Sequence, residues 1–128
     1  MKLDLVDIFS TYNLFLLFTS FADDGWTNRW VKSKSKEAEG TAGTWEISAG
    51  KYYNDANEDK GLKTAQDARF YQISSALPKE FSNKGKDLIF QFSVKHEQKI
   101  DCGGGYFKLL PAVSNFYFIF VIFFLKFH

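Results

Sequence analysis

The chain has very little cysteine, proline and methionine. Its 128 residues include one cysteine, two prolines and one methionine, so a disulfide within the chain is excluded and Cys102 is an odd thiol. An excess of charge is also missing, because 16 basic residues face 15 acidic ones and the formal net charge is +1. This balance gives no broad field for nucleic acid or an anionic membrane, and we expect neither as a partner.

A hydrophobic run long enough for a membrane helix is absent as well. The stretch from Phe116 to Phe127 is apolar and aromatic, but it is well short of the about 20 residues that such a helix needs. We therefore expect no transmembrane span. The stretch does not alternate polar and apolar residues as a half-buried strand does, and if exposed it favours aggregation. Residues 112–128 are interpreted as an apolar aromatic tail foreign to the domain.

The N-terminal end matches a secretory signal poorly. Asp4 and Asp7 interrupt the basic leader of such a signal, and the unbroken apolar run is only Leu14 to Phe18, whereas a signal core has roughly 7 to 15 residues. We interpret residues 1–19 as a leader or poor signal-like segment, and the alternative is a frayed first strand. Nearly all charged residues lie further along, so residues 20–111 are the predicted domain.

The predicted domain contains short strands separated by glycines. The chain is 45% hydrophobic and 19% aromatic, which is enough for a core. In DLIFQFSVK, from Asp87 to Lys95, apolar and polar residues alternate as in a strand with one buried face. The predicted core face carries Leu88, Phe90, Phe92 and Val94. Further strands are predicted at residues 44–48 and 69–74, which together indicate an all-β sandwich.

The stretch KHEQKIDCGGGYFKLLP, from Lys95 to Pro111, places three glycines before another alternating segment. If Phe107 and Leu109 face the core, Tyr106 and Lys108 share the opposite face. A tyrosine ring and a lysine ammonium suit the CH face and the hydroxyl oxygens of a sugar. The glycines leave space beside such a surface; the alternatives are a bulge or a flexible hairpin connection, with ordinary surface residues after it.

Several segments together resemble the lectin domain of the calreticulin/calnexin family. They are GWTNRWVKS at Gly25, DKGLKTAQDARFYQIS at Asp59 and FSNKGKDLIFQFSVKHEQKIDCGGGYFKLL at Phe81. EGTAGTWEISAGK at Glu39 is similar to plant members. The resemblance implies a jelly-roll, concanavalin-like β-sandwich, truncated here. It also implies a lectin chaperone of the endoplasmic reticulum lumen, which binds monoglucosylated high-mannose N-glycans on unfolded glycoproteins.

The resemblance assigns roles to particular residues. Tyr106 would stack on and orient the terminal glucose, and Lys108 would donate to its hydroxyls. A weak structural calcium ion would be held by the backbone carbonyls of Ser20, Glu58 and Lys60. The family's partner for Cys102, the second half of the sandwich and the KDEL retention signal do not follow Pro111.

The sequence also contains partial matches to other functions. Asp55, Asn57 and Asp59 have the first spacings of an EF-hand loop, but later positions that require Gly and Glu carry Lys and Gln, so no EF-hand is expected. Glu97 and Asp101 could serve a glycosidase, and His96 is interpreted as a surface or core histidine; we expect no enzyme. The main alternative is a truncated product that cannot complete its sandwich and self-associates through open strand edges.

Overall fold

The structure is a computed structural model of the chain. It describes residues 2–10, 14–21, 23–77, 82, 84–99, 102–111 and 119–127, and for the strands within 3–10, 14–20 and 119–127 it describes the backbone. The elements in chain order are β1 (Lys2–Ser10), β2 (Leu14–Ser20), α1 (Trp26–Arg29), β3 (Val31–Lys32), β4 (Trp45–Ser48), β5 (Gly61–Thr64), β6 (Arg69–Ala76), β7 (Leu88–Lys95), β8 (Cys102–Leu110) and β9 (Ile119–Phe127).

Five of these strands form the first sheet, which we call sheet A. Its path is β2-β1-β5-β4, and β7 pairs with β1. β1 is central, since β7 follows one of its edges while β5 and then β2 follow the other. All three of these pairings are antiparallel. β2, β5 and β7 therefore pair with β1 directly, and β4 reaches it through β5.

The other four strands form sheet B, in the order β3-β6-β9-β8. β9 pairs with β6 from Arg69 to Ala76 and with β8 from Cys102 to Leu110, both times antiparallel and without a register shift. β6 and β8 consequently run parallel to each other with one strand between them. This register fixes which residues of β8 lie level with which residues of β6.

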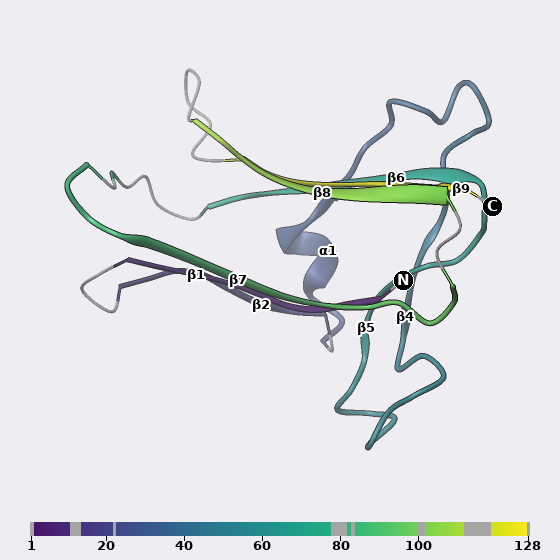
Figure 1. Ribbon diagram of the computed structural model, residues 1–128, viewed down its shortest axis with the longest axis horizontal. Coiled ribbons are helices and arrows are strands. Elements are labelled where there is room, and N and C mark those ends of the chain that lie inside the picture. Colours follow the sequence, from purple (N-terminus) through teal and green to yellow (C-terminus); the bar gives the residue numbers. More distant parts are fainter. Residues whose placement is uncertain are drawn as a thin grey trace.

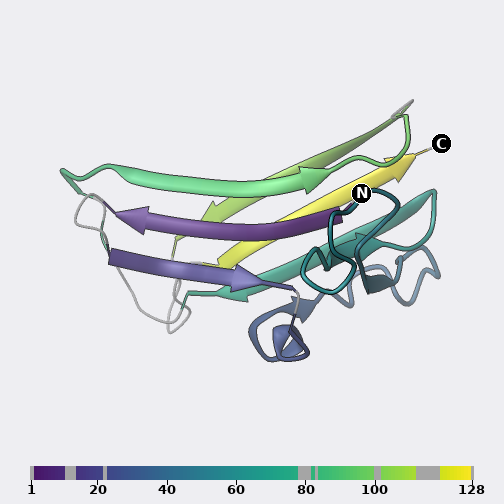
Figure 2. The same cartoon turned by 90° about the horizontal axis from the view of Figure 1, so that it is seen from below.

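The two sheets lie face to face as the layers of a sandwich (Figure 1). Figure 2 shows β7 and β8 along one side of the sandwich, while α1 closes the opposite side. The prediction of an all-β sandwich is confirmed, with the single helical turn of α1 as the exception. In the part of the chain that the structure describes, no helix is long and apolar enough to cross a membrane.

The core between the layers is aromatic. Its buried residues are Phe21, Trp26, Trp30, Trp45, Leu62, Tyr71, Ile73 and Leu77. Phe21 packs on Trp30 with ring centroids 5.4 Å apart, and Trp45 meets Tyr71 edge to face at 5.1 Å. The hydroxyl of Ser75 donates to the carbonyl of Arg29 at 2.7 Å, which joins the helical turn to β6. Burying this many aromatic rings is the main stabilising contribution of the sandwich.

The strand predicted from DLIFQFSVK is confirmed as β7, but one residue of its predicted core face is not buried. Leu88, Phe90 and Val94 pack against the core, but 45% of Phe92 is exposed. β7 lies at the edge of sheet A, where the layer above covers it only partly. Phe92 instead stacks on Phe107 of β8, with centroids 3.8 Å apart, and so bridges the two edge strands.

Both ends of the chain contribute strands to the sheets. Residues 1–19, the predicted leader or poor signal-like segment, contain β1 and all of β2 except Ser20, and these two strands pair with each other. The tail at residues 112–128 contains β9, which lies between β6 and β8. That residues 1–19 are a leader or poor signal-like segment, and that residues 112–128 are foreign to the domain, both stay predictions.

Candidate carbohydrate-binding surface

The face of β8 that points away from the core carries the two residues proposed to bind sugar. Phe107 and Leu109 pack against the core, as predicted. Tyr106 and Lys108 therefore point to the outer face of sheet B, where 56% of Tyr106 is exposed and Lys108 is exposed as well. The strand places both side chains on one surface because successive residues alternate between its faces.

The two side chains are also close to each other. The Nζ atom of Lys108 lies 6.0 Å from the centroid of the Tyr106 ring, at the outer limit of a cation–π contact. The ammonium is thus held beside the ring with its donors exposed. An aromatic face with a charged donor at its side can take the CH face of a sugar and bind its hydroxyls.

The glycines before Tyr106 form part of the strand. Gly103, Gly104 and Gly105 pair with β9 in unbroken register, so the alternatives of a bulge and of a hairpin connection are wrong. A Cβ atom added to Gly104 would lie 3.6 to 3.8 Å from the hydroxyl and ring atoms of Tyr106. The ring therefore lies over the bare backbone at Gly104, and the glycine run keeps the surface beside it open.

The turn expected to hold calcium contains Glu58 and Lys60, and its carboxylates already serve the backbone. Asp55 Oδ1 accepts from the N–H groups of Asn57 and Glu58, while Asp59 Oδ2 accepts from those of Asn54 and Asp55. These contacts are typical of Asx turns. The carboxylates of Asp55 and Asp59 thus shape the turn.

A buried lysine anchors the same turn. Only 1% of Lys2 is exposed, and its ammonium donates to the carbonyls of Asp59 and Ala49. Hydrogen bonds from the amides of Asp55 and Asn54 lower the pKa of Asp59, against a smaller effect of desolvation, and the charges of Lys2 and Lys95 add to the lowering. Charge and hydrogen bonding together fix this loop to the ends of β1 and β7.

The described residues offer only part of a calcium site. Glu58 and Lys60 lie just before β5, and the role of their carbonyl oxygens as ligands stays a prediction. Ser20, at the end of β2, would be the third. Calcium takes six to eight oxygen ligands, and no group of three or more His, Cys, Asp or Glu side chains suited to a metal occurs among the described residues.

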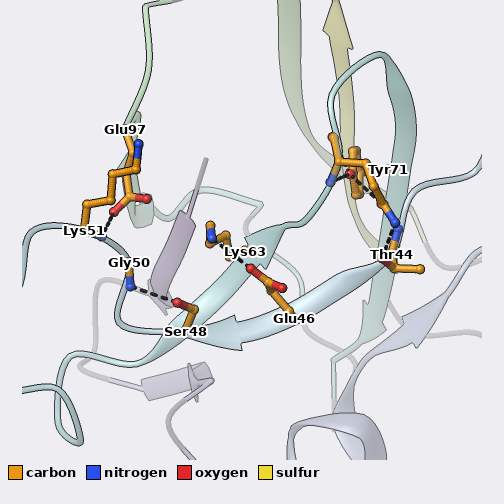
Figure 3. Close-up of polar contacts among 9 residues, drawn as sticks. Thr44, Glu46, Ser48, Gly50, Lys51, Lys63, Tyr71 and Glu97 are labelled. Atoms are coloured by element: carbon orange, nitrogen blue, oxygen red, sulfur yellow. Dashed lines mark hydrogen bonds and ion pairs between the residues drawn. The ribbon is translucent and has the colours of Figure 1, made fainter.

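Glu97, considered as a glycosidase carboxylate, holds a loop instead. Its Oε1 atom accepts from the N–H of Lys51 at 2.6 Å (Figure 3), and a Cβ atom at Gly50 would clash with the carboxylate. Desolvation acts to raise the pKa of Glu97, but the Lys51 amide and the charges of Lys63 and Lys95 outweigh it and lower that pKa. Its proposed partner, Asp101, lies outside the described residues, and His96 is exposed.

The comparisons with known proteins decide the family. The profile of the Calreticulin family matches residues 17–119. The chain belongs to the calreticulin family. Calreticulins are lectin chaperones of the endoplasmic reticulum lumen and bind calcium, and the family is not one of enzymes.

Calreticulins from distant organisms match most of the chain. The calreticulin of Onchocerca volvulus is 57% identical over 108 residues, which are 84% of this chain and 27% of that protein. The calreticulin of Chlamydomonas reinhardtii is 50% identical over 77% of this chain and 23% of its own length, and that of Oryctolagus cuniculus is 57% identical over 70% and 20%. The chain spans about a quarter of these curated relatives. The similarity of the segment that begins at Glu39 to plant members of the family stays a prediction.

A solved calreticulin domain has the same fold. The T. cruzi calreticulin globular domain is 42% identical and superposes with a TM-score of 0.56, covering 73% of this chain and 34% of that chain. The jelly-roll sandwich implied by the resemblance is thereby confirmed. The two sheets described above are therefore part of a calreticulin lectin domain.

Proposed function

We propose that this chain is part of a lectin chaperone that binds monoglucosylated high-mannose N-glycans on unfolded glycoproteins in the endoplasmic reticulum. One observation carries the proposal: Tyr106 and Lys108 lie together on the exposed outer face of β8, with the ammonium 6.0 Å from the ring. The ring stacks on the terminal glucose and the ammonium donates to its hydroxyls. The chain binds its ligand without altering it and is no enzyme.

Calcium has a structural role in this proposal. The carbonyls of Ser20, Glu58 and Lys60 contribute to a weak site, and an ion there would tie β2 to the turn before β5. Chelation would then loosen the sheet that lies behind the sugar surface. Its effect on glycan binding is indirect, because Tyr106 and Lys108 belong to the other sheet.

A titration of the purified 128-residue chain with a monoglucosylated oligomannose tests the proposal. Saturable binding is expected for the wild type, and it should weaken when calcium is chelated. Tyr106→Ala should abolish binding. Tyr53→Ala, which removes another tyrosine that is 54% exposed, is the matched control and should leave binding unchanged. Equal affinity of Tyr106→Ala and wild type would refute the site.

A second candidate is an incomplete product without glycan binding of its own. Its supporting observation is the open side of the sandwich, where β7 pairs with β1 alone and β8 with β9 alone among the described strands. Ile89 and Phe92 of β7 are 49% and 45% exposed there. Unpaired edges with exposed apolar residues favour association between chains. Aggregation without saturable glycan binding would support this second candidate.

A further inference from the structure

An aromatic contact joins the two sheets behind the proposed sugar surface. The rings of Phe92 of β7 and Phe107 of β8 have centroids 3.8 Å apart and planes inclined by 34°. Phe90, two residues before Phe92, meets the Phe107 ring as well, with centroids 5.9 Å apart. β7 belongs to sheet A and β8 to sheet B, and both strands run along the same side of the sandwich (Figure 2). The rings therefore connect the two layers at their edge.

The inner face of β8 has few other side chains that hold the strand in place. Residues alternate between the two faces of a strand, so positions 103, 105, 107 and 109 face inward, and the first two of them are glycines. Phe107 and Leu109 pack against the core. Phe107 is the first of these two after the glycines, and it lies between Tyr106 and Lys108 in the strand. The part of β8 that carries Tyr106 is thus held to the core through Phe107.

Backbone pairing holds β8 along one edge. Among the described strands, β8 pairs with β9 alone. Glycine gives a backbone more conformational freedom than other residues do, and the run Gly103 to Gly105 comes just before Tyr106. A strand with one paired edge and a pliable first half can shift relative to the core unless a side chain fixes it. The Phe107 ring, which packs on Phe92, provides this fixed point.

The contact lies on the opposite side of β8 from the sugar surface. Phe107 points inward, whereas Tyr106 and Lys108 point to the outer face of sheet B. The Nζ atom of Lys108 lies 6.0 Å from the centroid of the Tyr106 ring, which is the outer limit of a cation–π contact. A small movement of the backbone between these two residues therefore separates the ring from the ammonium. Phe92 affects that backbone through Phe107 and contacts no sugar.

We propose that Phe92 and Phe107 are positioning residues for the glycan surface. Their ring contact fixes the backbone of β8 and, with it, the relative positions of the Tyr106 ring and the Lys108 ammonium. This inference rests on the proposed function of Tyr106 and Lys108. A residue of sheet A thereby controls a binding affinity that arises on the outer face of sheet B.

Substitutions of Phe92 test the proposal, with a tetrasaccharide of one glucose on three mannoses as the probe. Phe92→Ala should weaken binding about 2- to 10-fold, the loss that corresponds to one aromatic pair. Phe92→Leu keeps an apolar side chain without the ring, so it should weaken binding as well. Phe92→Tyr keeps the ring and should retain the wild-type affinity. Ile89→Ala is the matched control, because Ile89 is 49% exposed on the same strand and lies outside the contact.

A double-mutant cycle separates positioning from a general loss of stability. Phe107→Ala should weaken tetrasaccharide binding, and adding Phe92→Ala to it should cause no further loss, because both changes remove the same contact. The ring resonances of Tyr106 should shift in Phe92→Ala and stay unchanged in Ile89→Ala. Near-ultraviolet dichroism of the buried tryptophans verifies that each variant keeps the fold.

The outcomes separate the positioning role from the function on which it rests. Wild-type affinity in both Phe92→Ala and Phe92→Leu would overturn the positioning role, and so would additive losses in the cycle or an equal loss in Ile89→Ala. If the wild type does not bind the tetrasaccharide, the proposed function fails and the positioning role fails with it.

Discussion

The ring of Tyr106 lies over the backbone of Gly104, whose added Cβ atom would come within 3.6 Å of the tyrosine hydroxyl. Both residues are on the outer face of β8, two positions apart. The distance is an ordinary van der Waals contact, so one methyl group fits beneath the ring. A branched side chain does not fit without moving it.

This contact predicts different outcomes for two substitutions at residue 104. Gly104→Ala should raise the free energy of unfolding by about 0.5 to 1 kcal/mol, because glycine weakens a strand by that amount relative to alanine, and should keep glycan affinity. Gly104→Val should not lower the free energy of unfolding, because β-branched residues favour strands. It should, however, displace the Tyr106 ring and reduce glycan affinity. Urea unfolding and calorimetric titration measure the two effects, and a Gly104→Val protein with unchanged affinity would contradict the contact.

The contact between Gly43 and Tyr71 predicts a loss of stability. A Cβ atom at Gly43 would clash with the Tyr71 ring, and this ring cannot move, because Tyr71 is fully buried and its hydroxyl exchanges hydrogen bonds of 2.6 Å with the backbone of Gln66. Gly43→Ala should therefore destabilise the fold by about 1 to 3 kcal/mol. Urea unfolding followed by tryptophan fluorescence measures it, with Gly104→Ala as the matched control. Equal stability of the two variants would disprove the clash.

The loop that Asp59 organises should weaken in acid. Hydrogen bonds from Asp55 and Asn54 lower the pKa of Asp59 in the folded chain, so its contribution to stability is complete above the ordinary aspartate pKa of about 4 and disappears as the pH falls through the folded value. Asp59→Asn should make the melting temperature fall less steeply below about pH 4. Asp24→Asn, at an exposed aspartate before α1, should follow the wild type. If the melting temperature of Asp59→Asn fell with pH as steeply as that of the wild type, Asp59 would not have this role.

The open edge at β7 should govern self-association. Ile89 is 49% exposed on this strand, and a charge on an edge strand opposes pairing with another chain. Ile89→Lys should lower the oligomer fraction in size-exclusion chromatography with light scattering. Val31→Lys is the control, because Val31 is 67% exposed but its strand, β3, has only two residues. If both variants lowered the oligomer fraction, or if neither did, the β7 edge would not be the surface that mediates self-association.

The sequence predicted the local features that a period of two residues determines. It predicted the strand β7, the opposite faces of β8 and the placement of Tyr106 with Lys108 on one of them. It did not predict the partner of β8, because a run of apolar residues such as Ile119–Phe127 has no alternation to mark it as a strand. Without β9 the position of β8 in its sheet is unknown.

The degree to which particular side chains are buried could not be predicted from the sequence either. Phe92 has the same place in the alternation as Phe90, yet 45% of it is exposed because β7 is the last strand of its sheet. Lys2 reads as an ordinary surface lysine, but it is buried beneath the loop whose carbonyls it binds. Both differences arise from contacts between residues far apart in the chain, and no local pattern encodes them.

The pairing of β1 with β7 joins Lys2 to Lys95 and Ser10 to Leu88. During synthesis the ribosome delivers residues from the N-terminus onward, so β1 must wait for β7 before its second edge is covered. Pairings between such distant segments close late and slow the folding of a chain. A nascent chain of this calreticulin segment thus exposes the centre of its own sheet A for most of its translation, and in that interval it resembles the unfolded clients that its family binds.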